Sequence, residues 1–573
     1  MSNPLLNSLK IAGIFLLTHY LSCVQISENE NASSISYLYK LDSASFEKQL
    51  RQVIESFDSI AVIDIEGVPV IISSFIRELY ERNSYLPYWH EKEAYRTYLK
   101  NLKEIHLDGL IREDYNYMQL QHLFQQINSL DTTNHKLVAA FDLITTNSLL
   151  LFSLHLAKGK SDPVKLDPNW NYDFLKSNPG EVDTIYRYLS QGAFDQLFHA
   201  IRSRSEFYLG MRNTMIDLYE AKAANAWDSI DFEGINKIEL GDSNQVVVAI
   251  KNRLNGLTKN AGNPIYDSST IALVMDFQEL HGLESDGVIG KGTMDALNYS
   301  IDYKINKVKA NMERARWLVS DLDEKLLVVN IADFNAYLMQ RDSILFSSKI
   351  MVGKTYTKTP IFQSVLSYAE INPTWTVPRS ILNRSILPKL RKDRNYLAKS
   401  NMKLLNFDGS QASIDGVDLN STSFPYVVRQ EPGPKNALGL VKFIFPNDFS
   451  VYLHDTNSRY LFARNKRTFS SGCVRLDQPL EWTRILLNDP KYDESAINEL
   501  IESGKTKRLY PKEKIRIMIL YFTHVTERKT GKPFYYKDVY NRDERILKVL
   551  NAPIDTQALI NRVQQLKKSR NAI

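Results

Sequence analysis

The sequence predicts a multidomain α+β protein in which a helical part precedes a β-rich part. Its 573 residues are enough for about three or four domains of ordinary size. Apolar residues recur at helical spacing over roughly the first half of the chain, whereas short apolar runs separated by polar turns begin near Leu326. Hydrophobic residues make up 43% and charged residues 24% of the chain, as is ordinary for a folded soluble protein.

The first 23 residues have the pattern of an export signal. Their apolar run, 11–17, is too short to cross a bilayer but has the length of the central part of a signal peptide. Ser22 and Cys23 resemble the end of a bacterial lipoprotein signal. Lipidation of Cys23 as a membrane anchor, simple cleavage and an uncleaved anchor remain open. Residues 24–40 are expected to be a polar tether, and export favours the periplasm or cell envelope.

The charge and the cysteine content narrow the class of function. A formal net charge of +5 is small for this length and argues against a nucleic-acid partner, which would require a concentrated basic face. The two cysteines are Cys23 and Cys473, so no pair would remain for an intramolecular disulfide after loss of the signal. The ten histidines form no cluster with metal-ligand spacing, and no phosphate-binding glycine loop occurs, so we expect no cofactor.

Residues 41–236 are expected to form a helical scaffold domain without catalytic spacing. Apolar residues recur at helical intervals over 46–57 and 72–82, and a longer apolar helix runs through 141–157. That helix should end at Lys158-Gly159-Lys160, because a cation followed by glycine is typical of helix C-termini.

Residues 237–300 are predicted to be a compact unit of short helices. Asp267 is a good N-cap for a helix over 268–280, and glycines at 282, 287 and 290 fit tight turns. The unit contains, in order, the motifs FQ, HGL, DGVIG and ALN. This order resembles the three-helix peptidoglycan-binding module. The resemblance implies the fold more firmly than the ligand, because such modules also serve as spacers.

In the second half of the chain, the spacing of apolar residues changes from helical to strand-like, and this change separates two regions. Residues 301–322 are expected to be a linking helix, and a β-rich catalytic domain follows over 323–510. Prolines interrupt the section of about 375–440, which we expect to be an inserted cap subdomain over the β core. Residues 511–573 form a C-terminal extension. Its expected elements are a strand over 517–522, a hairpin near 530–532 and a basic helix over 555–570.

The most informative motif pairs a histidine with a cysteine. His454 ends a predicted strand, and Cys473 lies in the sequence Ser471-Gly472-Cys473-Val474-Arg475. A cysteine nucleophile needs a nearby imidazole to form the thiolate near neutral pH, because a free thiol titrates near ~8.5. Gly472 leaves room for a substrate beside the sulfur. Asp455 is expected to be structural, because its side chain should point to the strand face opposite that of His454.

Several segments around this pair resemble, in order, the L,D-transpeptidases with a YkuD-type catalytic domain, and specifically their long YcbB-like branch. They are residues 352–354, 359–360, 372–378, 430–439, 442–443, 445–447, 453–456, 461–462 and 470–475. With the helical scaffold and the peptidoglycan-binding-like module, the resemblance covers nearly the whole mature chain. It implies a peptidoglycan cross-linking enzyme whose partners are peptidoglycan stem peptides.

The resemblance also implies a mechanism. Cys473 attacks the carbonyl of the third residue of a tetrapeptide stem, D-alanine leaves, and the amine of a second stem resolves the thioester into a 3→3 cross-link. His454 takes the thiol proton and returns it to the departing amine. Backbone N–H groups of Gly472 and Cys473 are expected to face the oxyanion. An L,D-carboxypeptidase or D-amino-acid exchange activity, which uses the same thioester, and a non-catalytic wall-binding protein remain alternatives.

Five further positions are candidates for the site. Arg475 is expected to orient the loop that carries Cys473 (residues 470–475, the nucleophile loop), to attract a stem carboxylate or to form a structural salt bridge. Tyr452 either lines the oxyanion side or belongs to the core. Ser471, Trp375 and Asn372 are expected to contact substrate, although Trp375 also suits packing within the cap. The sequence contains no indication of the oligomeric state.

Overall fold

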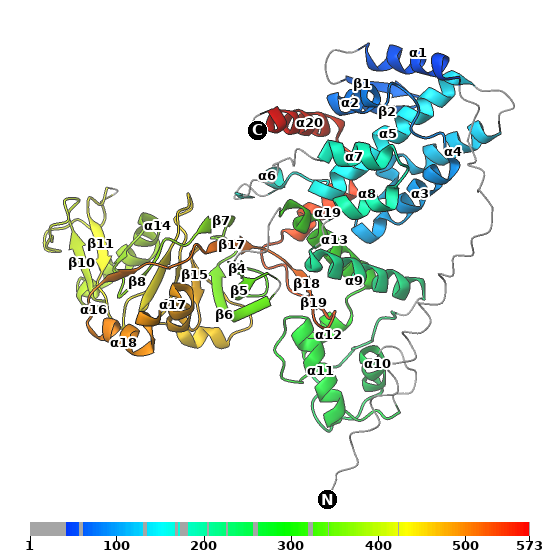
Figure 1. The fold of residues 1–573 in the computed structure, drawn as a ribbon. Helices are drawn as coiled ribbons and strands as arrows, with labels where there is room; N and C mark the ends of the chain where they lie inside the picture. Colours follow the sequence, from blue (N-terminus) through cyan, green and yellow to red (C-terminus); the bar gives the residue numbers. More distant parts are fainter. Residues whose placement is uncertain are drawn as a thin grey trace, which may run out of the picture.

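The computed structural model describes residues 42–56, 61–129, 134–166, 170–171, 181–202, 205–224, 227–255, 262–318, 325–341, 343–421 and 423–571. The predicted signal, Cys23 and the polar tether lie outside these residues. Figure 1 shows a helical body, a smaller helical body below it and a β-rich body to one side. The predicted multidomain α+β architecture is confirmed.

The scaffold is built around one buried helix. Its helices are α1 (Ser43–Ile54), α2 (Ser74–Arg82), α3 (Lys92–Lys103), α4 (Tyr117–Asn128), α5 (His135–Lys158), α6 (Pro163–Leu166), α7 (Glu181–Leu189), α8 (Phe194–Ile201) and α9 (Glu206–Ala223), with a hairpin of β1 (Ala61–Ile65) and β2 (Val68–Ile72). Among the described residues, α5 alone is long and apolar enough to cross a membrane, but 78% of its most apolar window is buried, as in a core helix. It ends at Lys158 with Gly159 as C-cap, as predicted.

The small helical body matches the predicted compact unit. It consists of α10 (Gln245–Leu254), α11 (Ser268–Leu280) and α12 (Lys291–Leu297) around its own apolar core. Asp267 caps α11 by accepting a hydrogen bond of 2.9 Å from the Thr270 N–H. The His281 ring stacks on Tyr535 of the C-terminal segment with ring centroids 5.5 Å apart. The unit therefore docks on the C-terminal segment through the turn that follows α11.

The predicted linking helix is buried between the scaffold and the C-terminal segment. Helix α13 (Ile301–Trp317) packs against α9 and against α19 (Asp543–Asn551) near the C-terminus. It carries lysines and arginines that are nevertheless buried. Buried charges require partners, and Arg314 is paired with Asp543 at 2.7 Å, while Arg316 is paired with Glu313 at 2.9 Å. This helix therefore holds the scaffold and the C-terminal segment together.

The β-rich body is a long mixed sheet. Its strands run in the order β16-β8-β12-β13-β15-β6-β5-β4-β17-β7-β3, with β14 also beside β6. Their bounds are β3 (Trp170–Asn171), β4 (Lys325–Asn330), β5 (Asn335–Gln340), β6 (Ser343–Gly353), β7 (Ile361–Val365), β8 (Tyr368–Ile371), β12 (Val441–Ile444), β13 (Leu453–His454), β14 (Thr468–Ser470), β15 (Val474–Leu476), β16 (Lys507–Leu509) and β17 (Arg516–Leu520). Helices α17 (Pro479–Leu487) and α18 (Glu494–Glu502) follow β15.

The C-terminal extension is part of this sheet. Strand β17 lies between β4 and β7 and runs parallel to β4, with Ile517 opposite Leu327. A domain boundary at residue 510 therefore places β17 outside the catalytic domain, although both strands that pair with it, β4 and β7, lie inside. The expected hairpin is formed by β18 (His524–Thr526) and β19 (Pro533–Tyr535). After α19, helix α20 (Thr556–Asn571) returns to the scaffold, where Arg562 donates a hydrogen bond of 2.7 Å to the Gly159 carbonyl.

The expected cap is a separate subdomain with a core of its own. It contains β9 (Trp375–Thr376), α14 (Arg379–Ile381), a π-helical turn (Leu382–Ile386), α15 (Leu387–Lys392), α16 (Tyr396–Lys399), β10 (Met402–Leu405) and β11 (Val427–Gln430). The strands form a three-stranded sheet in the order β10-β11-β9, and apolar side chains such as Leu390 and Val428 are fully buried beneath it. In Figure 1 this subdomain forms the far end of the β-rich body.

Candidate active site

The sheet places His454 and Cys473 on the same face of two neighbouring strands, in diagonal positions. Strands β13 and β15 are parallel, with His454 opposite Arg475 and Leu453 opposite Val474. Cys473 directly precedes β15, so its sulfur lies beside the segment that leads into β13, 3.9 Å from the Ser450 carbonyl oxygen. The thiol is free and partly buried. The predicted nucleophile and the predicted base are therefore neighbours in space.

The histidine is held in one tautomer. The Nδ1 of His454 is hydrogen-bonded to the backbone carbonyl of Asp455. A carbonyl only accepts, so Nδ1 carries the proton and Nε2 keeps its lone pair. Burial lowers the pKa of His454 to about 3, and the nearby cation of Arg475 contributes. The ring is therefore neutral at physiological pH and suited to accept a proton at Nε2.

Asp455 is structural, as the alternation of strand side chains predicts. One of its carboxylate oxygens accepts a hydrogen bond of 2.9 Å from Arg459, and the other accepts one of 2.8 Å from the Leu440 N–H. A Cβ atom at Gly439 would lie 2.3 Å from the Asp455 carboxylate, so this close approach requires glycine. The Asp455 carboxylate thus holds in place the segment that leads into β12.

The thiol is neutral in the resting site. Burial raises the pKa of Cys473 above its ordinary value, while hydrogen bonds from Tyr452 and the charges of Lys442 and Arg475 act in the opposite direction. The Tyr452 hydroxyl contacts the sulfur, and its ring centroid lies 5.6 Å from that of His454. Tyr452 thus lines the site. The Trp375 side chain reaches the same hydroxyl from the cap, so Trp375 both packs in the cap and borders the site.

The backbone of the nucleophile loop corrects one prediction. Gly472 has φ +127°, a conformation that favours glycine, and its N–H donates a hydrogen bond of 3.1 Å to Ser470 Oγ. That N–H is therefore already used, and the predicted oxyanion donor at Gly472 is not available in this arrangement. The N–H of Cys473 is the remaining donor of the predicted pair. Ser471 is exposed beside it, where it is accessible to a substrate.

Asn372 is a second correction. It is 3% exposed and has φ +49°, so it occupies a left-handed turn after β8. Its side-chain amide donates to the carbonyls of Leu500 and Ile501, at 2.9 and 3.0 Å, near the end of α18. Both observations indicate that Asn372 holds the turn after β8 against the end of α18. The predicted substrate contact at Asn372 is therefore not supported, because its amide is buried and committed to the backbone.

A tyrosine far along the chain supports the nucleophile loop. The Tyr540 hydroxyl donates a hydrogen bond of 2.6 Å to the Gly353 carbonyl and accepts one of 3.2 Å from the Thr359 N–H. The Thr359 hydroxyl in turn donates to the Gly472 carbonyl at 2.9 Å. Sequence reasoning missed Tyr540, because nothing in its local pattern marks one tyrosine among the 31 of this chain.

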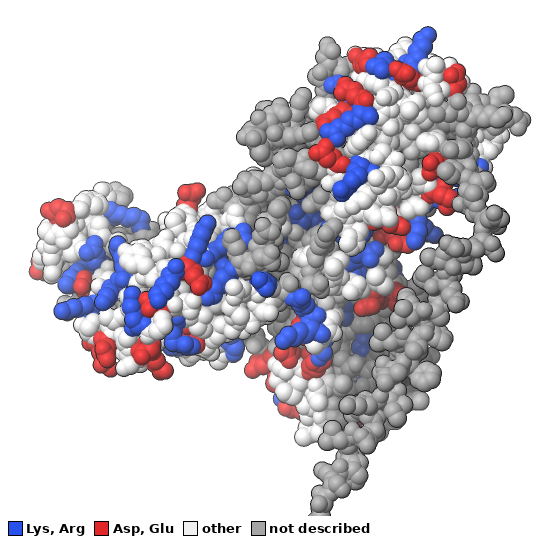
Figure 2. Space-filling view, in the orientation of Figure 1, with Lys and Arg blue, Asp and Glu red and all other residues white. Residues whose placement is uncertain are grey.

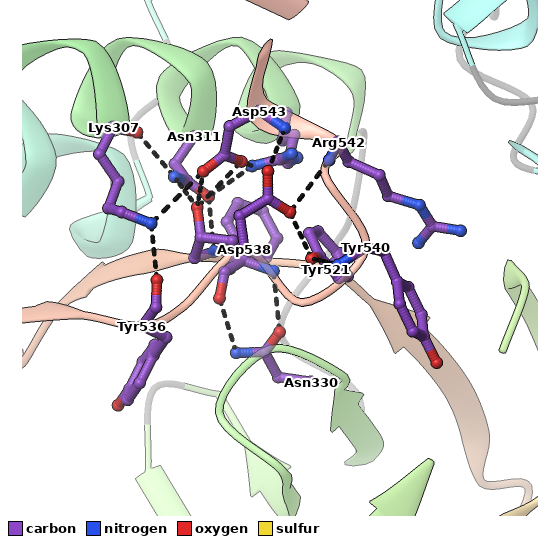
Figure 3. A network of polar contacts seen from close by, with 12 residues as sticks. Lys307, Asn311, Asn330, Tyr521, Tyr536, Asp538, Tyr540, Arg542 and Asp543 are labelled. Atoms are coloured by element: carbon purple, nitrogen blue, oxygen red, sulfur yellow. Dashed lines mark hydrogen bonds and ion pairs between the residues drawn. The ribbon is translucent and has the colours of Figure 1, made fainter. Parts of the chain in front are cut away.

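Figure 3 shows that Tyr540 also belongs to a network that reaches α13. Its backbone N–H donates to the Tyr521 hydroxyl at 2.8 Å, and that hydroxyl donates to Asp538. The other oxygen of Asp538 accepts from the Asp543 N–H at 2.8 Å, and the Asp543 carboxylate binds Arg314 of α13. A continuous series of contacts thus links helix α13 to the residues beside Cys473.

Lys442 is the site residue that the candidate set omitted. It lies directly opposite His454 on β12, and its ammonium group is 4.5 Å from the Tyr452 ring centroid. A lysine within the apolar strand Val441–Ile444 is itself a signal, because charges are uncommon at such positions. On the other side of His454, Arg475 makes no ion pair with any described residue, so the expectation of a structural salt bridge there is not supported.

Comparison with known protein families matches three separate parts of this chain. Residues 324–488 match the L,D-transpeptidase catalytic domain, named YkuD, and this range contains both His454 and Cys473. Residues 74–215 match a scaffold domain, and residues 243–297 match a "putative peptidoglycan binding domain". These matches identify a YkuD L,D-transpeptidase catalytic domain together with a peptidoglycan-binding domain, as predicted, whereas the YcbB-like branch stays a prediction.

Individual proteins and solved structures are similar to parts of this chain. A Haemophilus influenzae protein named "putative L,D-transpeptidase" is 32% identical over 243 residues, which cover 42% of this chain and 48% of that protein. The chain thus spans about half the length of this relative. An L,D-transpeptidase (Yku) structure from Stackebrandtia nassauensis matches at 11% identity, over 50% of this chain and 96% of that chain, with a TM-score of 0.20. A second L,D-transpeptidase, from Xylanimonas cellulosilytica, matches at 14% identity, over 50% and 97%, with a TM-score of 0.14.

Proposed function

We propose that this protein is an L,D-transpeptidase that forms 3→3 peptidoglycan cross-links through a thioester on Cys473. The observation that carries the proposal is the pairing of β13 with β15, which places a buried neutral imidazole beside the single thiol of the described chain, within the matched catalytic domain. The tautomer of His454 supports its role as base, because Nε2 is left to accept the thiol proton.

The chemical steps follow from these groups. His454 Nε2 takes the proton of Cys473 as the sulfur attacks the carbonyl of the third stem residue. The tetrahedral oxyanion is stabilised by local donors, for which the Tyr452 hydroxyl and the Cys473 N–H are the candidates. The intermediate collapses to a thioester, and D-alanine leaves with the proton from His454. The amine of a second stem then attacks, which forms the cross-link and regenerates the thiol.

The remaining domains suit a wall polymer as the substrate. The peptidoglycan-binding domain would hold a glycan strand, and the signal-like first 23 residues would direct the enzyme to the periplasm or cell envelope, with Cys23 as a lipid anchor if it is modified. On the face drawn in Figure 2, lysine and arginine side chains are frequent over the β-rich body. Such a surface would tolerate an anionic polymer.

The decisive experiment is mass spectrometry of muropeptides after incubation with the purified protein. We expect dimers with 3→3 links in the wild type and none in Cys473→Ala, whose thermal unfolding should remain unchanged. Tripeptides without dimers would assign an L,D-carboxypeptidase, and exchange of the terminal D-alanine for an added D-amino acid would assign the exchange reaction. If no product depended on Cys473, the enzymatic proposal would be rejected in favour of a wall-binding protein.

A further inference from the structure

Two cations flank His454 on one face of the sheet. The registers of β12, β13 and β15 place Lys442 and Arg475 directly opposite His454, one on each side. Residues directly opposite each other on neighbouring strands have side chains on the same face. The same row continues through Glu370 on β8 and Arg508 on β16. The reactive thiol therefore lies beside a row of charged residues that crosses five strands.

Neither flanking cation forms an ion pair with an acid among the described residues. The acid in the row, Glu370, lies directly opposite Lys442 and acts to raise the pKa of that lysine, but its carboxylate is paired with Arg508 at 3.4 Å. Lys442 lies instead against the Tyr452 ring and makes no ion pair with another described residue. The Nε of Arg475 is buried and has no hydrogen-bond partner among the described residues. The Asp455 carboxylate, which is close in sequence, is taken by Arg459 and the Leu440 N–H.

The thiol does not compensate these charges at rest. Burial raises the pKa of Cys473, so the sulfur is uncharged near neutral pH, and burial also lowers the pKa values of Lys442 and Arg475. Charges removed from water without a counter-ion are costly. An anion that enters this site would therefore be bound by two cations at once. A carboxylate fits best, because the planar guanidinium of arginine can bind it through two parallel hydrogen bonds.

We propose that Lys442 and Arg475 together form a carboxylate-binding site beside Cys473, which holds a carboxylate group of the stem peptide next to the reacting carbonyl. The identity of the ligand as a stem peptide rests on the proposed function, whereas the binding of a carboxylate beside the thiol does not. A bound carboxylate would also oppose the charges that lower the pKa of His454, so that the substrate itself makes His454 a stronger base.

The test uses two alkylating agents of nearly equal size. Iodoacetate carries a carboxylate and iodoacetamide a neutral amide, and both react by the same step, in which the Cys473 thiolate displaces iodide and the thiol proton goes to solvent. Their rate ratio at Cys473 is independent of the thiolate fraction, because both agents react with the same thiolate. Comparison with the ratio for a free thiol such as N-acetylcysteine then reports the local preference for a carboxylate.

We expect the iodoacetate to iodoacetamide ratio to be higher at Cys473 than at the free thiol. Lys442→Met, which keeps the length of the side chain, should lower the ratio about tenfold at low ionic strength, and Lys442→Gln and Arg475→Gln should lower it as well. Lys507→Met is the matched control. Lys507 precedes Arg508 on β16, two strands from Lys442, so its side chain is on the other face of the sheet, and its loss should leave the ratio unchanged.

An unchanged ratio in both Lys442 variants, with unchanged thermal unfolding, would overturn the proposal. A fall of equal size in Lys507→Met would also overturn it, since the effect would then come from net charge alone. A second measurement compares stem peptides with free and with amidated carboxylates: Lys442→Met should raise KM for the free acid and not for the amide. If no stem peptide reacts at all, the proposed function fails, and the alkylation ratio still decides whether the carboxylate site exists.

Discussion

The hydroxyl of Tyr540 donates a hydrogen bond of 2.6 Å to the carbonyl of Gly353, at the end of β6. Tyr540 lies outside the matched catalytic range, 324–488, yet its hydroxyl also accepts from the Thr359 N–H, and Thr359 bonds to Gly472. The C-terminal segment therefore contributes to the position of the nucleophile loop. This relationship makes the loop dependent on residues that the catalytic domain by itself does not contain.

Replacement of Tyr540 by phenylalanine should loosen the nucleophile loop. The change removes two hydrogen bonds at a buried site, which we expect to cost about 2 kcal/mol of stability. Amide hydrogen exchange of residues 470–475 should become faster, and kcat for cross-linking should fall several-fold with little change in KM. Tyr95→Phe is the matched control, because Tyr95 makes a similar hydrogen bond of 2.7 Å to the Leu120 carbonyl within the scaffold. Equal exchange rates in wild type and Tyr540→Phe would contradict the positioning role.

The pH dependence of Cys473 alkylation should show that Cys473 and His454 are both uncharged near neutral pH. The pKa of Cys473 is raised by burial and that of His454 is lowered to about 3, so neither group is charged near neutral pH. Because the thiol pKa is above its usual ~8.5, the rate of alkylation by iodoacetamide should keep rising with pH through this value. The measurement is the rate of adduct formation by intact mass from pH 5 to 10. A plateau between pH 6 and 8 would indicate an ion pair of thiolate and imidazolium and would contradict this expectation.

Loss of the Asp543 carboxylate charge should strongly destabilise the junction at α13. Asp543→Asn leaves Arg314 and Lys307, whose side chains are 4% and 3% exposed, without their counter-ion. Breaking a buried pair in this way costs about 3–5 kcal/mol. As a control, Asp302→Asn removes a partner of Lys222 at the surface, where an ion pair contributes less than about 1 kcal/mol. Urea denaturation of both variants provides the comparison, and equal losses would show that the junction pair is not specially stabilising.

Protonation of His281 should oppose folding in acid. His281 is buried between Phe277 and Tyr535, and burial lowers its pKa to about 3. The unfolded state, with a pKa near ~6.5, binds a proton between these two values that the folded state does not bind. The contribution of His281 to stability is therefore lost as pH falls below ~6.5, at about 1.4 kcal/mol per pH unit. His281→Phe should reduce the slope of unfolding free energy against pH by this amount between pH 4 and 6, and an identical slope would contradict the assignment.

The features that the sequence predicted correctly are those set by local pattern. Helix α5 ends at Lys158 with Gly159, and Asp267 caps α11, because capping depends on residues within one turn. The cap was predictable because prolines and apolar residues cluster within its own 66-residue span of about 375–440 and bury one another there. The pairing of His454 with Cys473 was predictable because the motif keeps both residues in one short stretch of chain.

The features that sequence reasoning missed depend on contacts between distant segments. The run Arg516–Leu520 predicts a strand, but its parallel neighbour, Lys325–Asn330, lies far away in sequence, and only pairing decides which sheet it enters. Residues 301–322 were predicted only as a linking helix, yet acids such as Asp543 and Glu313 allow the lysines and arginines of α13 to be buried. Asn372 was predicted to contact substrate, whereas backbone carbonyls of a distant helix already accept from its amide. The predicted oxyanion donor at Gly472 is used by the hydroxyl of Ser470, a side chain whose orientation the sequence pattern does not show.

The sequence by itself predicted the class of chemistry, because a candidate thiol nucleophile and its candidate base are recognisable from residue types at short spacing. It also determined where the helical, cap and β-rich regions lie, since periodicity and capping are local. Only the tertiary structure decided which groups surround the thiol: Lys442 and Arg475 flank His454 through strand register, and Tyr540 supports the loop through a distant hydrogen bond. Burial and pairing act through space, and they set the charges of the site independently of the order of residues along the chain.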